Sequence, residues 1–190
     1  EKVMYQAQEV AGVIATDRYA AADGVDAVEV DYEPLPVVVD PFKALEPGGP
    51  VLRTDKKDKK DNHIFHWEAG DRKATDSAFA SAEVTVKQDI YLPRIHVASI
   101  ETCGCVADFE RVTGKLTVYM TTQAPHAIRT VVALVAGHVG LSEEKIRIIS
   151  PDIGGGFGGK VPVYPGYVIA VAASVLTGKP VKWIEDRMEN

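Results

Sequence analysis

The order of hydrophobic and polar positions along this chain predicts many short strands and a few helices. Each predicted strand shows either alternation with a period of two or a short apolar run bounded by turn residues. These strands are 9–15, 27–33, 64–68, 81–92, 103–109, 115–121, 145–150 and 181–185. A turn at Thr113-Gly114 makes the strands at 103–109 and 115–121 a predicted hairpin.

Helical spacing appears between these strands. Residues 125–138 place an apolar side chain at every third or fourth position, and 164–176 is almost wholly apolar and therefore expected to be buried. Gly178, followed by Pro180, ends the second of these helices. A shorter helix is predicted at 17–26, and a helix or a turn at 72–79. Helices and strands mix without strict alternation, which predicts an α+β fold.

Composition and charge exclude some classes of protein and partner but do not alter the predicted elements. The chain has 190 residues, 46% of them hydrophobic and 25% charged, as in an ordinary globular protein. A net charge of -6 argues against nucleic acid or an anionic membrane as a partner. No apolar run reaches membrane-spanning length, and no signal peptide is visible. We expect the chain to be a piece of a longer polypeptide. Its two cysteines do not form the pattern of a secreted disulfide scaffold and favour a reducing cytoplasm.

A glycine-rich loop carries most of the chemical information. It runs through Gly154, Gly155 and Gly156 to Phe157 and then Gly158-Gly159, directly after the predicted strand at 145–150. Glycine permits positive φ and close approach of a ligand to the backbone, and successive N–H groups in such a turn bind anions. The loop therefore predicts a cradle for a phosphate, pterin or metal-oxo group, with a plain glycine turn as the alternative.

Two nucleotide-binding motifs almost fit this loop. The glycines satisfy G-x-G-x-x-G, but prolines at 162 and 165 delay the helix that should open on the pyrophosphate. The run ending at Lys160 satisfies G-x-x-x-x-G-K, but Val161 replaces the Ser or Thr that would bind Mg²⁺. A nucleotide-binding domain is therefore a weak alternative.

Other chemistry-bearing residues leave alternatives open. Gln123, between a predicted strand and a helix, either offers an N–H donor to an oxo group or carbonyl or bonds the local backbone. Cys103 and Cys105, with the distant His63 and His66, lack zinc-site spacing. We interpret the cysteines as small buried side chains beside a sheet.

Three motifs in order resemble a known family. They are Glu101-Thr-Cys-Gly-Cys-Val-Ala107, Thr121-Thr-Gln-Ala-Pro-His126 and Asp152-Ile-Gly-Gly-Gly-Phe-Gly-Gly-Lys160. They are similar to motifs of the large subunits of molybdenum hydroxylases, the xanthine dehydrogenase and aldehyde oxidase family. The resemblance covers essentially the whole chain, and it is greatest to the carbon monoxide dehydrogenase branch.

The resemblance implies a domain layout and a set of site residues. Residues 1–46 would end an α/β hammerhead domain, 47–63 would be a linker, and 64–190 would begin the molybdopterin-binding domain, with mixed sheets and flanking helices. Gln123 would donate a hydrogen bond to an oxo ligand of molybdenum. The loop would line metal and pterin, with Phe157 near the substrate channel. Cofactor-binding residues would be Gln123, Gly154, Gly155, Gly156, Phe157 and Gly158, and none would ligate a metal directly.

The same resemblance implies a reaction and partners. Carbon monoxide would be oxidised with water to carbon dioxide by molybdenum in molybdopterin cytosine dinucleotide, with copper. Electrons would pass to an iron–sulfur small subunit and an FAD-binding medium subunit, in a dimer of heterotrimers. The enzyme would be cytoplasmic, with association at the inner face of the membrane as a further expectation. The family's glutamate base and copper-binding cysteine would lie beyond residue 190, so the 190 residues alone should be inactive and hold no cofactor.

Two other functions remain open at this point. An aldehyde or purine hydroxylase would have the same motifs with a different small-molecule substrate. A non-catalytic structural or assembly module would instead use exposed strands to bind partner chains.

Overall fold

The computed structural model of the chain describes residues 2–5 and 8–190. The chain divides into two compact units, one formed by Glu1–Glu29 with Ile95–Asn190 and the other by Val30–Arg94. The first unit contains the only sheet found among the described residues and every residue of the candidate site. The predicted hammerhead, linker and molybdopterin-binding parts remain a prediction.

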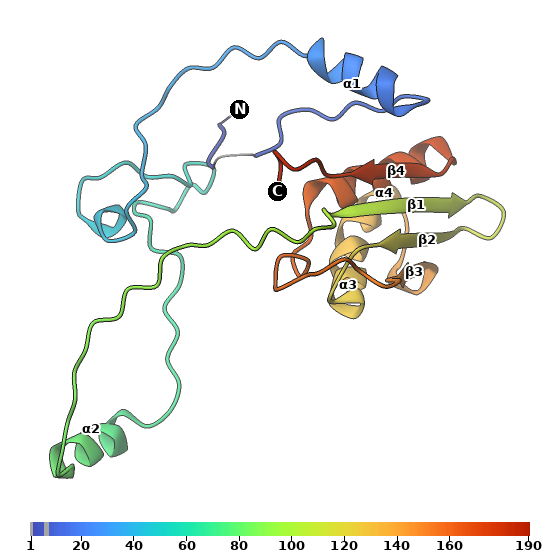
Figure 1. The fold of residues 1–190 in the computed structure, drawn as a ribbon. Helices are drawn as coiled ribbons and strands as arrows, with labels where there is room; N and C mark the ends of the chain where they lie inside the picture. Colours follow the sequence, from blue (N-terminus) through green and yellow to red (C-terminus); the bar gives the residue numbers. More distant parts are fainter. Residues whose placement is uncertain (1, 6–7) are drawn as a thin grey trace. The chain divides into compact units, whose positions relative to one another are not determined.

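A four-stranded mixed sheet forms the centre of the first unit (Figure 1). Its strands are β1 (Gly104–Glu110), β2 (Lys115–Met120), β3 (Ile146–Ile149) and β4 (Val181–Ile184), in the order β3-β2-β1-β4. β1 pairs antiparallel with both β2 and β4, whereas β2 and β3 are parallel. The hairpin predicted from Thr113-Gly114 is confirmed, and Gly114 has the positive φ of 65° that its turn requires.

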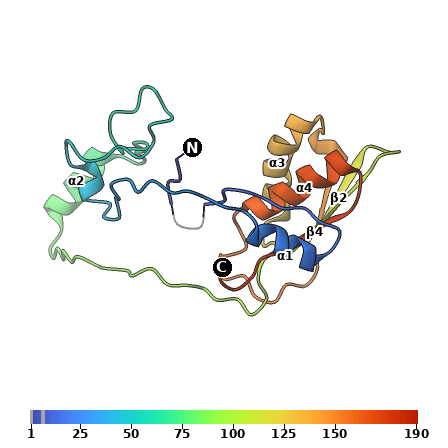
Figure 2. The same cartoon turned by 90° about the horizontal axis from the view of Figure 1, so that it is seen from above.

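Two helices lie side by side on one face of this sheet (Figure 2). They are α3 (Pro125–Ala136) and α4 (Pro165–Thr177), and each begins with a proline, whose fixed φ suits the first helical position. α4 is as buried as its apolar sequence predicts. The core between helices and sheet contains Cys105, Ala107, Leu116, Val118, Met120, Ile128, Val132, Ala136, Ile146, Tyr167, Ala170 and Val171. This mixed sheet with flanking helices confirms the predicted fold class.

The remaining helices are short. α1 (Arg18–Asp26) begins at Asp17, whose carboxylate accepts two backbone N–H groups, and α2 (Arg72–Ser81) begins in the same way at Asp71. Single 3₁₀ turns occur at Lys43–Leu45, Gly137–Val139 and Glu143–Lys145. Within the described part of the chain, none of the helices has the length and apolar content needed to cross a bilayer.

Four predicted strands are wrong. Residues 9–15, 27–33, 64–68 and 82–92 are irregular chain without sheet partners among the described residues, and Ser81 is the last residue of α2. An alternating pattern states which face a side chain would take, but a strand forms only when a second backbone pairs with it. The alternating apolar residues of 81–92 are accordingly exposed, for example Val84 at 77% and Val86 at 81%.

The two cysteines are small buried side chains at the sheet, as the sequence indicated. Cys103 and Cys105 are free thiols, 2% and 4% exposed. Burial in apolar surroundings raises the pKa of the Cys105 thiol to about 12 and also raises that of Cys103. Neither is a ready thiolate ligand at neutral pH.

Candidate functional site

The glycine-rich loop connects β3 to α4 and takes a strained backbone path. Gly155 and Gly158 have φ values of 94° and 91°, which glycine adopts without steric cost. Phe157 has φ 48° and exposes 76% of its surface. A bulky residue with positive φ is a genuine outlier that costs energy, and such outliers cluster at functional sites. The loop therefore presents an exposed aromatic ring from a backbone held by its surroundings.

Gln123 holds the loop through its side-chain carbonyl. Its Oε1 accepts hydrogen bonds from the backbone N–H groups of Gly158, at 3.0 Å, and Lys160, at 3.2 Å. The backbone N–H of Gln123 in turn donates to the backbone carbonyl of Lys160 at 3.0 Å. Because backbone N–H groups can only donate, the oxygen of the amide must face them. The Nε2 group, with two donor hydrogens, is left without a hydrogen-bond partner within the described residues.

Two glycines of the loop permit close packing rather than positive φ. A Cβ on Gly156 would lie 2.5 Å from Oε1 and 2.7 Å from Cγ of Gln123. A Cβ on Gly154 would lie 2.5 Å from the Cβ of Glu101. Contacts below 3.0 Å force neighbouring atoms to shift. The glycine-rich sequence is therefore required in part by two side chains from distant segments.

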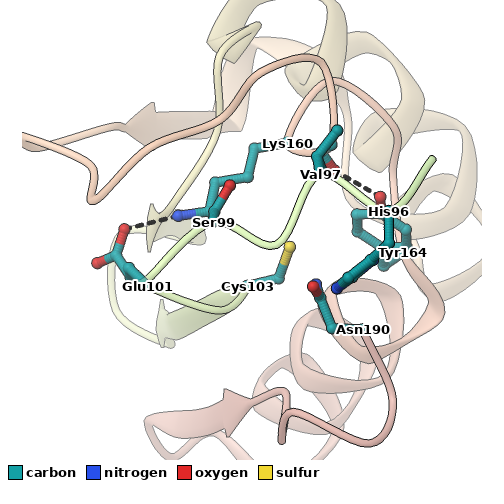
Figure 3. Close-up of a pocket in the computed structure, with 9 residues that line it drawn as sticks. His96, Val97, Ser99, Glu101, Cys103, Lys160, Tyr164 and Asn190 are labelled. Carbon is teal, nitrogen blue, oxygen red and sulfur yellow. Dashed lines mark hydrogen bonds and ion pairs between the residues drawn. The ribbon is translucent and has the colours of Figure 1, made fainter.

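Glu101, which packs against Gly154, forms an ion pair with Lys160 (Figure 3). The Lys160 ammonium, whose side chain is 2% exposed, lies 2.7 Å from Oε2 of Glu101, and the same oxygen accepts the Gly154 N–H at 2.7 Å. The hydrogen bond from Lys160, assisted by that from Gly154, holds the pKa of the Glu101 carboxyl below its ordinary value, although burial opposes this. The carboxylate is therefore charged throughout the neutral range.

A small cavity of about 110 Å³ lies beside this pair, lined in part by Ser99, Cys103 and Tyr164 (Figure 3). Its volume is below the roughly 300–1,000 Å³ of typical small-molecule sites. Among the described residues, Ser99 Oγ is the buried side-chain polar atom without a hydrogen-bond partner. Buried hydroxyls are almost always satisfied, so this one is available to a polar group or water.

Together these features fit an anionic, oxygen-rich group bound against the loop. The free Nε2 donor of Gln123, the unused N–H groups of Gly155 and Gly156 and the unsatisfied Ser99 hydroxyl are donors of the kind that such a group needs, whereas the N–H groups of the other glycines are already bonded within the protein. No three His, Cys, Asp or Glu side chains converge to hold a metal ion in residues 2–5 and 8–190.

The predicted site residues divide into a group in contact and an outlier. Gln123 meets the loop at Gly156 and Gly158, as a site requires. Gly154 and Gly155 belong to the same loop, and the ring of Phe157 lies beside Gly155 while most of it is exposed. The predicted roles of these residues in catalysis and cofactor binding remain predictions.

Sequence reasoning missed Glu101, Lys160 and Ser99. In the sequence, Glu101 is visible only as the first residue of a motif, and Lys160 only as the last residue of the glycine motif and of an incomplete P-loop pattern. A lysine directly after the glycines was the available signal, because a buried ammonium needs a carboxylate partner. The late helix was predicted correctly: α4 begins at Pro165, so its N-terminus does not open at the glycines.

Comparisons with known proteins agree with this geometry. The model of the molybdopterin cofactor-binding domain family matches residues 55–190. The carbon monoxide dehydrogenase large chain of Hydrogenophaga pseudoflava is 57% identical over 199 residues, which cover 100% of this chain and 24% of that one. The chain therefore spans about a quarter of the length of this curated relative.

Two solved structures are similar as well. The crystal structure of the Cu,Mo-CO dehydrogenase in its carbon monoxide reduced state has a TM-score of 0.79 at 57% identity, covering 93% of this chain and 23% of that chain. Quinoline 2-oxidoreductase from Pseudomonas putida 86 has a TM-score of 0.72 at 34% identity, covering 92% and 21%. The chain belongs to the molybdopterin cofactor-binding domain family of the molybdenum hydroxylases.

Proposed function

We propose that this chain is part of the molybdenum-bearing large subunit of an oxidoreductase that converts carbon monoxide and water to carbon dioxide, two protons and two electrons. The observation that carries the catalytic part is the fixed orientation of the Gln123 amide, with its oxygen occupied and its N–H donors free. The similarity to carbon monoxide dehydrogenases supports the choice of substrate.

The residues of the chain would bind and orient. The Nε2 group of Gln123 would supply a preorganised donor to an acceptor atom at the metal centre, and the N–H groups of Gly155 and Gly156, which have no hydrogen-bond partner within the described residues, would be further donors. Donors that are already oriented stabilise charge without reorganisation during the reaction, which is the largest single contribution in many enzymes. Phe157, whose ring is exposed on the loop, would lie near the channel through which the substrate reaches the metal. When bound, the molybdenum cofactor supplies the two-electron oxidation chemistry.

Further properties of the whole enzyme belong to the same proposal. The cofactor is molybdopterin cytosine dinucleotide with molybdenum and copper. Its electrons leave through an iron–sulfur small subunit and an FAD-binding medium subunit, in a cytoplasmic dimer of heterotrimers. Cys103 and Cys105 are not the copper ligands, because both are buried and their thiol pKa values are raised. The 190 residues alone are inactive, and carbon monoxide oxidation by them alone would contradict this.

Metal analysis of the protein in its native assembly tests the substrate class first. Molybdenum and copper in near-equal amounts, with carbon monoxide-dependent reduction of a dye, is the expected result. The absence of molybdenum would overturn the proposal.

One substitution tests the N–H donor of the Gln123 side chain separately from its oxygen acceptor. Gln123→Glu keeps an oxygen that accepts the Gly158 and Lys160 N–H groups but removes the N–H donor. We expect normal molybdenum content with a turnover loss of roughly 100-fold, the usual effect of removing one such donor. Gln88→Glu, at an exposed position outside the site, is the matched control and should leave turnover unchanged. Full turnover in Gln123→Glu would refute the role of the donor.

A second candidate is a hydroxylase of N-heterocycles or aldehydes. The similarity to quinoline 2-oxidoreductase favours it, since that fold match extends over 92% of this chain. Molybdenum without copper, together with oxidation of an N-heterocycle or aldehyde and no activity on carbon monoxide, would select this candidate.

A further inference from the structure

Glu101 binds both ends of the glycine-rich loop with one atom. Its Oε2 accepts the N–H of Gly154 at 2.7 Å and the ammonium of Lys160 at 2.7 Å. Its own N–H donates to the Gly154 carbonyl at 3.2 Å. Moving this carboxylate would therefore release the start and the end of the loop together.

Lys160 connects Glu101 to Gln123. The backbone N–H of Lys160 donates to the side-chain Oε1 of Gln123. The backbone carbonyl of Lys160 accepts the backbone N–H of Gln123 at 3.0 Å and the Thr122 hydroxyl at 3.2 Å. The side chain of Lys160 is thus bound to Glu101 and its backbone to Gln123. A shift of the Lys160 ammonium would therefore displace the side-chain amide of Gln123 through the backbone of Lys160 itself.

The electrostatics make this link stiff. The Lys160 side chain is 2% exposed, and Glu101 is the only residue in the described chain that forms a salt bridge with it. A buried ammonium that loses its carboxylate is strongly unfavourable, so the pair holds one geometry. Fold stability alone does not need a charged side chain at position 160, because an apolar side chain of similar volume often serves a buried position as well. The pair lies instead where three segments meet at the candidate site.

We propose that Glu101 and Lys160 are positioning residues, whose ion pair fixes the position of the side-chain Nε2 donor of Gln123 and of the glycine-rich loop. This inference rests on the proposed role of Gln123. It predicts that Glu101 influences turnover through Gln123, although no hydrogen bond joins their side chains.

The experiment uses Glu101→Gln in the full protein in its native assembly, alone and combined with Gln123→Glu. The matched control is Glu143→Gln, which breaks the Arg129–Glu143 pair at 3.1 Å; the carboxylates at 101 and 143 are each 40% exposed. Turnover per molybdenum and KM are measured together with hydrogen exchange at individual backbone amides. Exchange can be measured whether or not the cofactor is loaded and does not require the reaction, provided that the variants are compared at equal cofactor content.

We expect Glu101→Gln to lower kcat roughly 10-fold to 100-fold with little change in KM, as misplacement of a catalytic group by a fraction of an ångström does. In the Gln123→Glu background the same change should cost less than about twofold, because the donor it positions is already gone. Exchange should rise at Gly158 and Lys160 as well as at Gly154. Glu143→Gln should leave all three readouts unchanged.

Three results would overturn the inference. The first is the full 10-fold loss again in the Gln123→Glu background, and the second is an increase in exchange confined to Gly154. The third concerns Glu101→Gln paired with Lys160→Met, which removes both charges and so avoids an unpaired ammonium if the single variant does not fold. Wild-type turnover in this variant would overturn the inference. Full turnover in Gln123→Glu alone would instead refute the proposed function, and the exchange at Gly158 would still decide the link.

Discussion

Replacing Gly156 by alanine adds one methyl group at the contact between the loop and Gln123. Gly156 does not have a positive φ, so alanine suits its backbone and the effect is steric alone. The new Cβ would lie 2.5 Å from Oε1 and 2.7 Å from Cγ of Gln123, where ordinary contact begins at 3.4 Å. The amide must therefore move by about 1 Å to reach normal van der Waals separation.

That movement has two costs. Oε1 leaves the N–H groups of Gly158 and Lys160, and each such hydrogen bond contributes about 1 kcal/mol net, so the loop loses about 2 kcal/mol. The Nε2 donor is also displaced, and a misplacement of about 1 Å lowers turnover by about 100-fold. The loss in turnover should therefore exceed the effect on the fold.

The assay is turnover per molybdenum in the native assembly, with hydrogen exchange of the loop amides. Gly137→Ala is the control, because a Cβ there meets nothing within 4 Å and the residue already has helical φ and ψ. It should be neutral or slightly stabilising. Wild-type turnover and unchanged exchange at Gly158 in Gly156→Ala would refute the packing argument.

Three other outcomes follow from the structure. Gly178→Ala should lower the free energy of unfolding by about 1–2 kcal/mol, measured by denaturant titration, because φ is 63° and the new Cβ would lie 2.6 Å from Nη2 of Arg111. Cys105 should resist iodoacetamide at pH 8 until the protein unfolds, because burial raises its pKa to about 12; rapid labelling of the native state would contradict this. The Glu101 carboxyl has a folded pKa below its ordinary value of 4.5, so the stability it contributes is present above about pH 4.5 and is lost as pH falls through the folded pKa. Titrations of unfolding against pH should show a smaller acid-induced loss in Glu101→Gln.

The fold was predictable where the pattern and its partner lie close together in sequence. The helices α3 and α4 make their own hydrogen bonds, and the β1–β2 hairpin needs only a turn at Gly114. The irregular segment at 82–92 has the alternation of a strand, but pairing depends on a second backbone that the pattern cannot specify. The sequence therefore predicted strand pairing only where the partner strand lies nearby in the chain.

The site divides in the same way. The glycines and Gln123 were found because their residue types and order are unusual, whereas the Glu101–Lys160 pair joins residues 59 positions apart. Nothing in a local window distinguishes Glu101 from a surface glutamate. Its role becomes visible only when the fold brings a buried ammonium within reach.

The interdependence of three segments limits how this loop can be transplanted. Its shape depends on a carboxylate 53 residues before Gly154 and on an amide 35 residues before Gly158. A protein engineer who copies the glycine run alone into another scaffold would transfer its flexibility and lose its form. The portable unit is the loop together with the chain entering β1 and the chain leaving β2.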